Sequence, residues 1–168
     1  MLMRHLLAIA MLPVIVAVVV PVWLARRNDV HLAIGSTPQE IVVQFAGLVI
    51  LVIGLTLFVS SVRRFAGDGK GTLAPWDPPR RLVISGPYRY VRNPMISGVV
   101  FLLFGEALLL LSRPHTTWAA AVFVINAIYI PLLEEPQLRA RFGAAYDEYC
   151  KHVPRLMPRL RPIKGEST

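Results

Sequence analysis

The stretch IVVQFAGLVILVIGLTLFVS, residues 41–60, decides the fold, because it is apolar almost all round over its 20 residues. A helix of this length, rising ~1.5 Å per residue, crosses a bilayer core of ~30 Å. A surface helix of a soluble protein would carry a polar stripe instead. The preceding Thr37-Pro38-Gln39-Glu40 favours a helix start, since proline suits the first turn and an acid suits the positive end of the helix dipole. We therefore predict a transmembrane helix.

Three further apolar blocks surround this one, at residues 6–24, 96–111 and 118–133. The first is predicted to be a retained helix and not a removed signal peptide, because it is long and lacks a small-residue cleavage site. The last two are joined by Ser-Arg-Pro-His-Thr-Thr, which predicts a helical hairpin with Pro114 in the turn. The expected fold class is all-α: an integral membrane bundle of four transmembrane helices, followed by a C-terminal cytoplasmic helix.

The positive charges predict the orientation. Fourteen of the 18 lysines and arginines lie in residues 61–95 or after residue 133. Four spans place both regions on one side of the membrane, and the positive-inside rule makes that side cytoplasmic. We therefore expect both termini in the cytoplasm, in the inner membrane of a bacterium. The chain is one membrane domain: two N-terminal helices (1–60), a cytoplasmic loop (61–95), a hairpin (96–133) and a cytoplasmic helix with a basic tail (134–168).

Composition argues against several other functions. Cys150 is the sole cysteine, so no internal disulfide forms, and the four histidines are scattered without the spacing of a metal site. The net charge of +8 would suggest nucleic acid in a soluble protein. In an apolar chain it is better explained by membrane orientation, so we expect the membrane as a partner and no nucleic acid.

A basic, aromatic loop, ISGPYRYVRNPMISG at residues 84–98, ends against the third apolar block. Gly86-Pro87 favours a turn, and Asn93-Pro94 breaks any helix before Pro94. A helix that starts at Pro94 directs its free N–H groups toward this loop, where a carboxylate can bind. Taken alone, the loop is more typical of an anchor on lipid headgroups.

Acidic residues mark the other side of the hairpin. Glu134 closes directly onto the fourth apolar block, where an acid is costly unless it meets a cation or a ligand. Glu135 can pair with Arg139 one helical turn later. Glu106 lies inside the third block, and pairing with Asn126 is the favoured interpretation over lining a cavity.

Together, the loop and the tail resemble a family. The pattern is G-P-Y-x-x-x-R-N-P-M, a hairpin, E-E-x-x-L-x-x-x-F-G-x-x-Y-x-x-Y, and V-P-R-x-x-P, over residues 60–162. It resembles the isoprenylcysteine carboxyl methyltransferase family, whose wider group includes the phospholipid N-methyltransferases. The matching residues are Gly86, Pro87, Tyr88, Arg92, Pro94, Met95, Glu134, Glu135, Leu138, Phe142, Gly143, Tyr146, Tyr149, Val153, Pro154, Arg155 and Pro158.

This resemblance implies a membrane-embedded methyltransferase that uses S-adenosylmethionine and a lipophilic acceptor, a carboxylate or an amine, entering from the bilayer. The mechanism that we expect is catalysis by positioning and desolvation without a dedicated base, with Asn93 and Glu134 as the candidate residues. The residues implied as cofactor contacts are Arg80, Arg81, Leu82, Val83, Tyr88, Asn93, Pro94, Met95 and Glu134.

Three positions depart from the prenylcysteine enzymes of that family, which have His at Asn93, Tyr at Ile96 and Arg at Ile130. The last position is associated with the substrate, so prenylcysteine is not the expected acceptor. Two other functions remain open: a nicotinamide-dependent membrane reductase of related architecture, and a non-catalytic accessory membrane protein.

Overall fold

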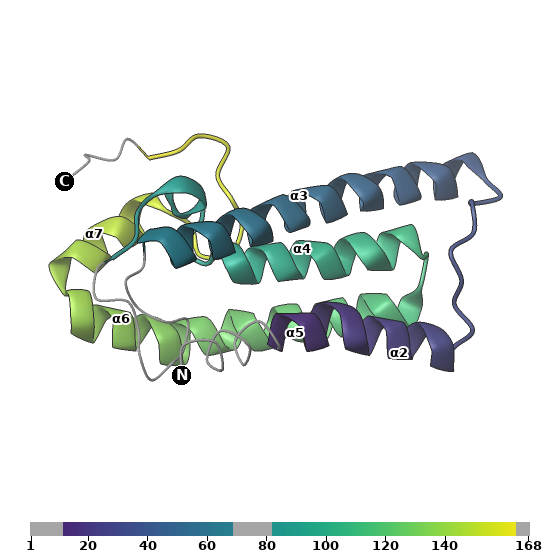
Figure 1. Ribbon diagram of the computed structural model, residues 1–168, viewed down its shortest axis with the longest axis horizontal. Coiled ribbons are helices and arrows are strands. Elements are labelled where there is room, and N and C mark those ends of the chain that lie inside the picture. The colour runs from purple at the N-terminus through teal and green to yellow at the C-terminus, as the bar shows by residue number, and fades with distance from the viewer. Residues whose placement is uncertain (1–11, 69–81, 164–168) are drawn as a thin grey trace.

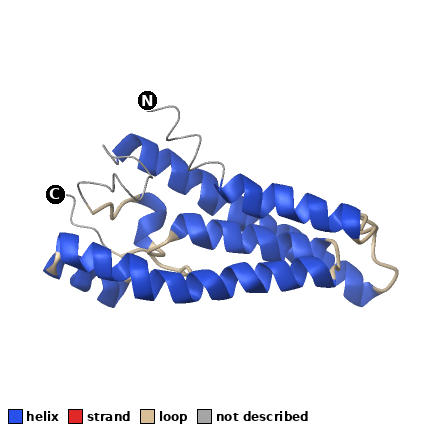
Figure 2. Cartoon of the chain, turned by 90° about the horizontal axis from the view of Figure 1, so that it is seen from below, coloured by secondary structure: helices blue, strands red, loops and turns tan. Residues whose placement is uncertain are grey.

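The computed structural model describes residues 12–68 and 82–163, without the side chains of 65–68. Every regular element in these residues is a helix, which confirms the all-α prediction (Figure 2). The elements are η1 (Ile15–Val19), α2 (Val20–Arg27), α3 (Pro38–Asp68), η2 (Gly86–Arg89), α4 (Pro94–Leu109), α5 (Arg113–Tyr129), η3 (Ile130–Glu134), α6 (Glu135–Phe142) and α7 (Ala144–His152).

The long helices run up and down in a bundle, with α3 beside α4 and α5 beside α2 (Figure 1). The loop before α4, the helices α6 and α7, and the tail gather at one end of this bundle (Figure 1). Two helical stretches, Pro38–Arg64 and Arg113–Phe142, are long and apolar enough to cross a membrane. Helix α4 is apolar but has only 16 residues. Four spans therefore remain a prediction.

Helix α3 begins as the sequence predicts. The Glu40 carboxylate accepts hydrogen bonds from the backbone N–H groups of Ser36 (2.7 Å) and Thr37 (3.2 Å), and the Thr37 hydroxyl accepts one from the Glu40 N–H (3.3 Å). This reciprocal arrangement is a capping box, which satisfies donors that have no partner inside the helix. Proline at the first helical position completes the start.

Glycines bring α3 and α4 into backbone contact. A Cβ atom on Gly54 would lie 2.6 Å from the Leu102 nitrogen, and one on Gly98 would lie 2.8 Å from the Phe58 nitrogen. One heptad along, Gly47 and Gly105 make the same kind of approach, to Leu109 and Leu51. Small residues allow such close packing, which is how apolar helices associate where no hydrophobic effect drives them together. The small positions of α3 therefore pack against the same chain.

The first helix is attached to α5 by buried side chains. In the π-helix η1 a residue bonds five positions back, but Pro21 has no N–H to donate to the Val16 carbonyl. The Trp118 indole donates to that carbonyl instead, at 3.0 Å. The buried His115 ring bridges the Ser112 hydroxyl and the Pro21 carbonyl.

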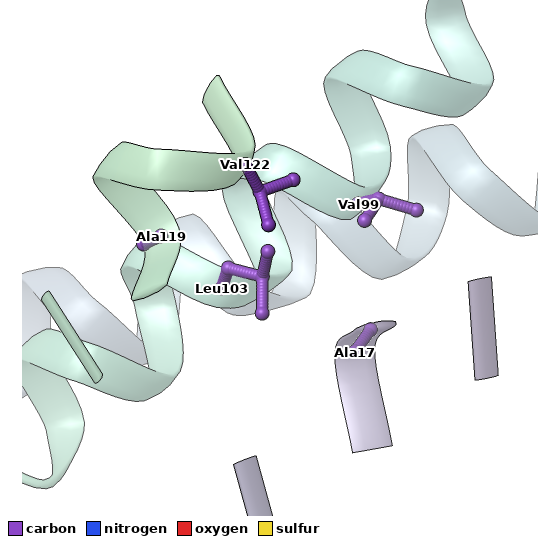
Figure 3. Packing of buried hydrophobic residues seen from close by; sticks show 5 residues of the cluster. All are labelled: Ala17, Val99, Leu103, Ala119 and Val122. Atoms are coloured by element: carbon purple, nitrogen blue, oxygen red, sulfur yellow. The ribbon is translucent and has the colours of Figure 1, made fainter. Parts of the chain in front are cut away.

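An apolar cluster fills the space between these helices. Figure 3 shows Val99 and Leu103 of α4 facing Ala119 and Val122 of α5, with Ala17 of η1 close by. Leu103 is 1% exposed and Ala119 is fully buried. The first helix therefore packs on the hairpin through a small core.

One proline behaves differently from the sequence expectation. Pro114 lies in the first turn of α5 and not in the connection, because proline is well tolerated where the N–H has no partner in any case. The helix also continues from α5 through η3 into α6, past Pro131 and Pro136. Pro136 lies in the first turn of α6, and the wider π turn of η3 accommodates the missing donors. The actual break is at Gly143, whose φ of +54° favours glycine.

Candidate functional site

A short 3-10 turn shapes the loop before α4. Gly86 has φ +57° and starts η2, in which the Tyr90 N–H donates to the Pro87 carbonyl at 3.0 Å. The Arg64 side chain occupies the space where a Cβ of Gly86 would lie, 2.9 Å from its Nε. Both the positive φ and the close approach of the Arg64 side chain from α3 therefore favour glycine at this position.

The tail forms a second layer against this loop. The Arg92 N–H donates to the Pro154 carbonyl (2.8 Å), and the Arg159 N–H donates to the Tyr90 carbonyl (3.0 Å). The Arg89 guanidinium donates to the Ile163 carbonyl through Nε (2.8 Å) and through Nη2. Main-chain hydrogen bonds therefore hold the tail against the loop, and such bonds depend little on side-chain identity. The prolines of V-P-R-x-x-P set the path of the tail.

A buried ion network joins α6 to both layers. The Glu135 side chain is 2% exposed and accepts two hydrogen bonds from Arg155, Nε to Oε1 at 2.6 Å and Nη2 to Oε2 at 2.9 Å. Arg92 Nη1 lies 2.9 Å from the same Oε1 and 2.8 Å from the Cys150 sulfur. A bidentate pair of this kind fixes geometry as well as charge. Glu135 therefore holds the loop, α6 and the tail together.

The pair between Glu135 and Arg139 that helical spacing favours is replaced by this network. Arg139 instead bonds Asp147 across Gly143, Nε to Oδ1 at 3.0 Å, and both side chains are largely exposed. Arg92 of the loop and Arg155 of the tail surround the buried Glu135 carboxylate, and Arg155 binds both of its oxygens. Arg139, on the same helix as Glu135, is more exposed. Because these partners lie 43 and 20 positions away, spacing within a helix could not reveal them.

Tyrosines form the core of this end. Tyr146, Tyr149 and Val153 are buried together, and Leu82 packs against them from the loop. The Tyr149 hydroxyl donates to the Tyr88 carbonyl at 2.6 Å. Burial is the main cause that raises the pKa of Tyr146 and of Tyr149. Both hydroxyls therefore stay neutral at ordinary pH and serve the packing.

Glu134 differs sharply from its neighbour. It ends the π turn η3, is half-buried, and has no hydrogen-bonding or ion-pairing partner among the described residues. The Tyr88 side chain lies near it: burial, and after it the Glu134 charge, raise the pKa of Tyr88 to about 12. A carboxylate that is partly desolvated and unpaired is costly, and π turns are frequent at functional sites. Glu134 is thus available for a ligand.

The remaining predicted residues lie at the same end. Asn93 caps the start of α4, where its carbonyl accepts bonds from the Ser97 N–H and hydroxyl, both at 2.9 Å, and its Nδ2 lies 3.4 Å from the Arg155 carbonyl. Pro94 is buried, and Val83 and Met95 are half-buried. Arg80 and Arg81 lie outside the described residues. The structure thus brings the described part of the predicted site to one end of the bundle.

Two parts of this site were missed by reasoning from the sequence. No partner was predicted for Arg92 or Arg155, and both are bound to Glu135. Ser97 was not considered, and its hydroxyl donates to the Leu156 carbonyl at 2.6 Å. The adjacent Glu134 and Glu135 gave a signal, because two neighbouring acids on a helix must face different surroundings.

The interpretation of Glu106 was wrong. Its expected partner Asn126 donates instead to the Val122 carbonyl of its own helix, at 2.8 Å. The Glu106 Oε2 atom is buried and has no partner within the described residues. Glu106 lies 12 residues after Pro94, about 18 Å along the helix at ~1.5 Å per residue, so it is remote from the loop.

These features have a counterpart in known proteins. The phospholipid methyltransferase family model matches residues 42–145, which is more than half of the chain. The chain belongs to the phospholipid methyltransferase family. The match runs from the first turns of α3 into α7, so it includes the loop, α4 and Glu134. The resemblance seen in the loop and tail motifs is confirmed for this wider group of methyltransferases.

The chain is also similar to a methyltransferase of known name. The chain is 40% identical over 76 residues to methanethiol S-methyltransferase 2 of Bradyrhizobium diazoefficiens. These 76 residues are 44% of this chain and 27% of the relative. The matched region therefore spans well under half the length of that relative. No solved structure matches the chain.

Proposed function

We propose that this protein is an integral membrane methyltransferase that transfers a methyl group from S-adenosylmethionine to a lipophilic acceptor. Family membership supports the reaction, and two apolar helical stretches of spanning length support the membrane. The proposed site lies at the cytoplasmic face of a bacterial inner membrane, with both termini on that side, because the lysines and arginines cluster in the segments at this end.

The observation that carries the proposal is the pair of adjacent acids with opposite surroundings. Glu135 is fully paired with arginines, whereas Glu134 has no ion-pairing partner within the described residues and lies near Tyr88. The donor set fits S-adenosylmethionine. Glu134 supplies an anion for its amine and sulfonium, Tyr88 an aromatic face for a cation, and Met95 and Ile96 the first N–H groups of α4 for its carboxylate.

The cofactor supplies an activated methyl group on a positively charged sulfur. The chain's own residues then have three tasks. Asn93 and Tyr88 position the reactants, and holding two reactants in line lowers a barrier by up to ~7–11 kcal/mol. Leu82, Val83, Pro94 and Met95 exclude water. Glu134 would balance the positive charge of the bound cofactor. Glu134 is the acid proposed beside the cofactor and would be engaged with it, so the proposed catalysis is by positioning, without a dedicated base.

The acceptor is proposed to be a lipid with an amine or carboxylate, in keeping with the family. Prenylcysteine is not proposed, because Ile130, where related enzymes have the arginine associated with that substrate, is fully buried. A lipophilic thiol is a second candidate, since the named relative is a methanethiol S-methyltransferase. Transfer of a labelled methyl group to extracted lipids, compared with transfer to small thiols, separates the two.

The first test is calorimetric binding of S-adenosylmethionine to the detergent-purified protein. We expect Glu134→Gln to weaken binding about tenfold or more, since a hydrogen bond to a charged group contributes ~1.5–3 kcal/mol. Glu148→Gln is the matched control, an exposed acid on α7 that pairs with Lys151. Equal binding by wild type and Glu134→Gln would contradict the proposed role. A folded protein that binds no S-adenosylmethionine would overturn the methyl donor and leave nicotinamide binding to be tested.

A further inference from the structure

The segment Leu156–Arg161 of the tail presents large apolar side chains to the outside. Leu160 is 98% exposed and Met157 is 65% exposed, although neither belongs to a helix. Met157 directly precedes Pro158, which cannot donate a backbone hydrogen bond, and Leu160 lies two residues after it. Their exposure is unlike that of the neighbouring Val153, which is 1% exposed in the tyrosine core. The tail therefore turns from the core to the surface within a few residues.

Hydrogen bonds fix the depth of this segment along the bundle. The Ser97 hydroxyl, in the first turn of α4, donates to the Leu156 carbonyl at 2.6 Å. The Arg159 N–H donates to the Tyr90 carbonyl, four residues before Pro94. Ser97 is three residues beyond Pro94, about 4.5 Å along the helix. The start of this segment therefore lies beside the first turn of α4, where the apolar helix begins, and Figure 1 shows the yellow tail passing that end of α4.

The charge of the segment is of one sign. Residues 156–163 read LMPRLRPI and contain two arginines and no acid. Arg161 is exposed, and Arg159 uses Nη1 for the His152 carbonyl (2.6 Å) while other guanidinium donors remain. Exposed leucine and methionine next to arginine, at the end of an apolar helix, are typical of a chain that lies in the interface of a bilayer.

We propose that Leu156–Arg161 is an interfacial anchor that binds the anionic lipid leaflet. Met157 and Leu160 enter the boundary between headgroups and acyl chains, and Arg159 and Arg161 bind lipid phosphates. Because the same segment is bonded to Tyr90 and Ser97, lipid binding holds the loop beside α4 in place. A protein partner would also accept basic and apolar side chains, but the depth of the segment favours lipid.

The test is a fluorescent label at Leu160→Cys, in a Cys150→Ser background, on protein reconstituted in phosphatidylglycerol or in phosphatidylcholine vesicles. Lys151→Cys, exposed on α7, is the matched reference position. We expect headgroup-level spin-labelled lipid to quench the label at 160 and not at 151, more strongly with phosphatidylglycerol. Each of Arg159→Gln and Arg161→Gln should weaken the association of the segment with anionic lipid about fivefold.

Hydrogen exchange on the unmodified chain gives a second readout that needs no cysteine replacement. We expect the amides of Met157, Arg159, Leu160 and Arg161 to be better protected in phosphatidylglycerol than in phosphatidylcholine vesicles. A label at 160 that is as water-exposed as one at 151 in both lipids, with equal exchange, would overturn the anchor. The patch would then be free for a protein partner.

Discussion

The α3–α4 interface and the loop–tail end both hold this chain together, but by opposite means. Between α3 and α4, glycines allow backbone atoms to touch. At the other region, a carboxylate, two arginines and main-chain bonds join segments that lie far apart in the sequence. The first region tolerates no added volume, whereas the second tolerates no lost charge. The α3–α4 interface is thus a closely packed scaffold, and the loop–tail end surrounds the proposed site.

The largest effect is expected at the polar end. Glu135→Gln leaves Arg92 and Arg155 without their counter-ion, and breaking a buried pair from one side costs ~3–5 kcal/mol, with the lower value favoured because Arg155 is 37% exposed. Thermal unfolding in detergent measures the loss. Glu134→Gln is the control, with nearly unchanged stability, since that acid has no such pair. Equal destabilisation by both changes would contradict the division between a structural acid and the acid that is proposed to bind the cofactor.

A smaller effect is expected at the glycine interface. In Gly54→Val the new Cβ would lie 2.6 Å from the Leu102 nitrogen, which is backbone and cannot rotate away. Overpacking of this kind costs ~1–3 kcal/mol. Val52→Leu, at a position on the same helix that is 53% exposed, provides the control with little change. If Gly54→Val and Val52→Leu unfold at the same temperature, α3 and α4 are less tightly packed than described.

The smallest effect is expected from one hydrogen bond between the loop and α7. Tyr149→Phe removes the hydroxyl that donates to the Tyr88 carbonyl at 2.6 Å and leaves the ring in the core. The expected loss is ~1 kcal/mol, the usual net value of such a bond. Hydrogen exchange should rise in the loop and stay constant in α3. Faster exchange in both regions would mean that the two behave as one cooperative unit.

Prediction from the sequence succeeded where the pattern was local. The apolar blocks gave the helices, Thr37 and Glu40 gave the start of α3, and the motifs on either side of the hairpin gave the family. It failed where a partner was distant. Glu106 and Asn126 do not pair, and Glu135 is bound by arginines of the loop and tail instead of by Arg139.

The sequence by itself determined an all-helical chain with spanning apolar stretches, and the order of its two polar segments, because helix length and hydrophobicity depend on neighbours along the chain. Only the tertiary structure decided that Glu135 is buried between two arginines while Glu134 has no such pair, and that Gly47 and Gly54 pack on α4. Adjacent acids are identical in composition and differ only in what lies opposite them. Glu135 has its arginine partners because the tail folds back onto the loop and brings Arg155 beside it.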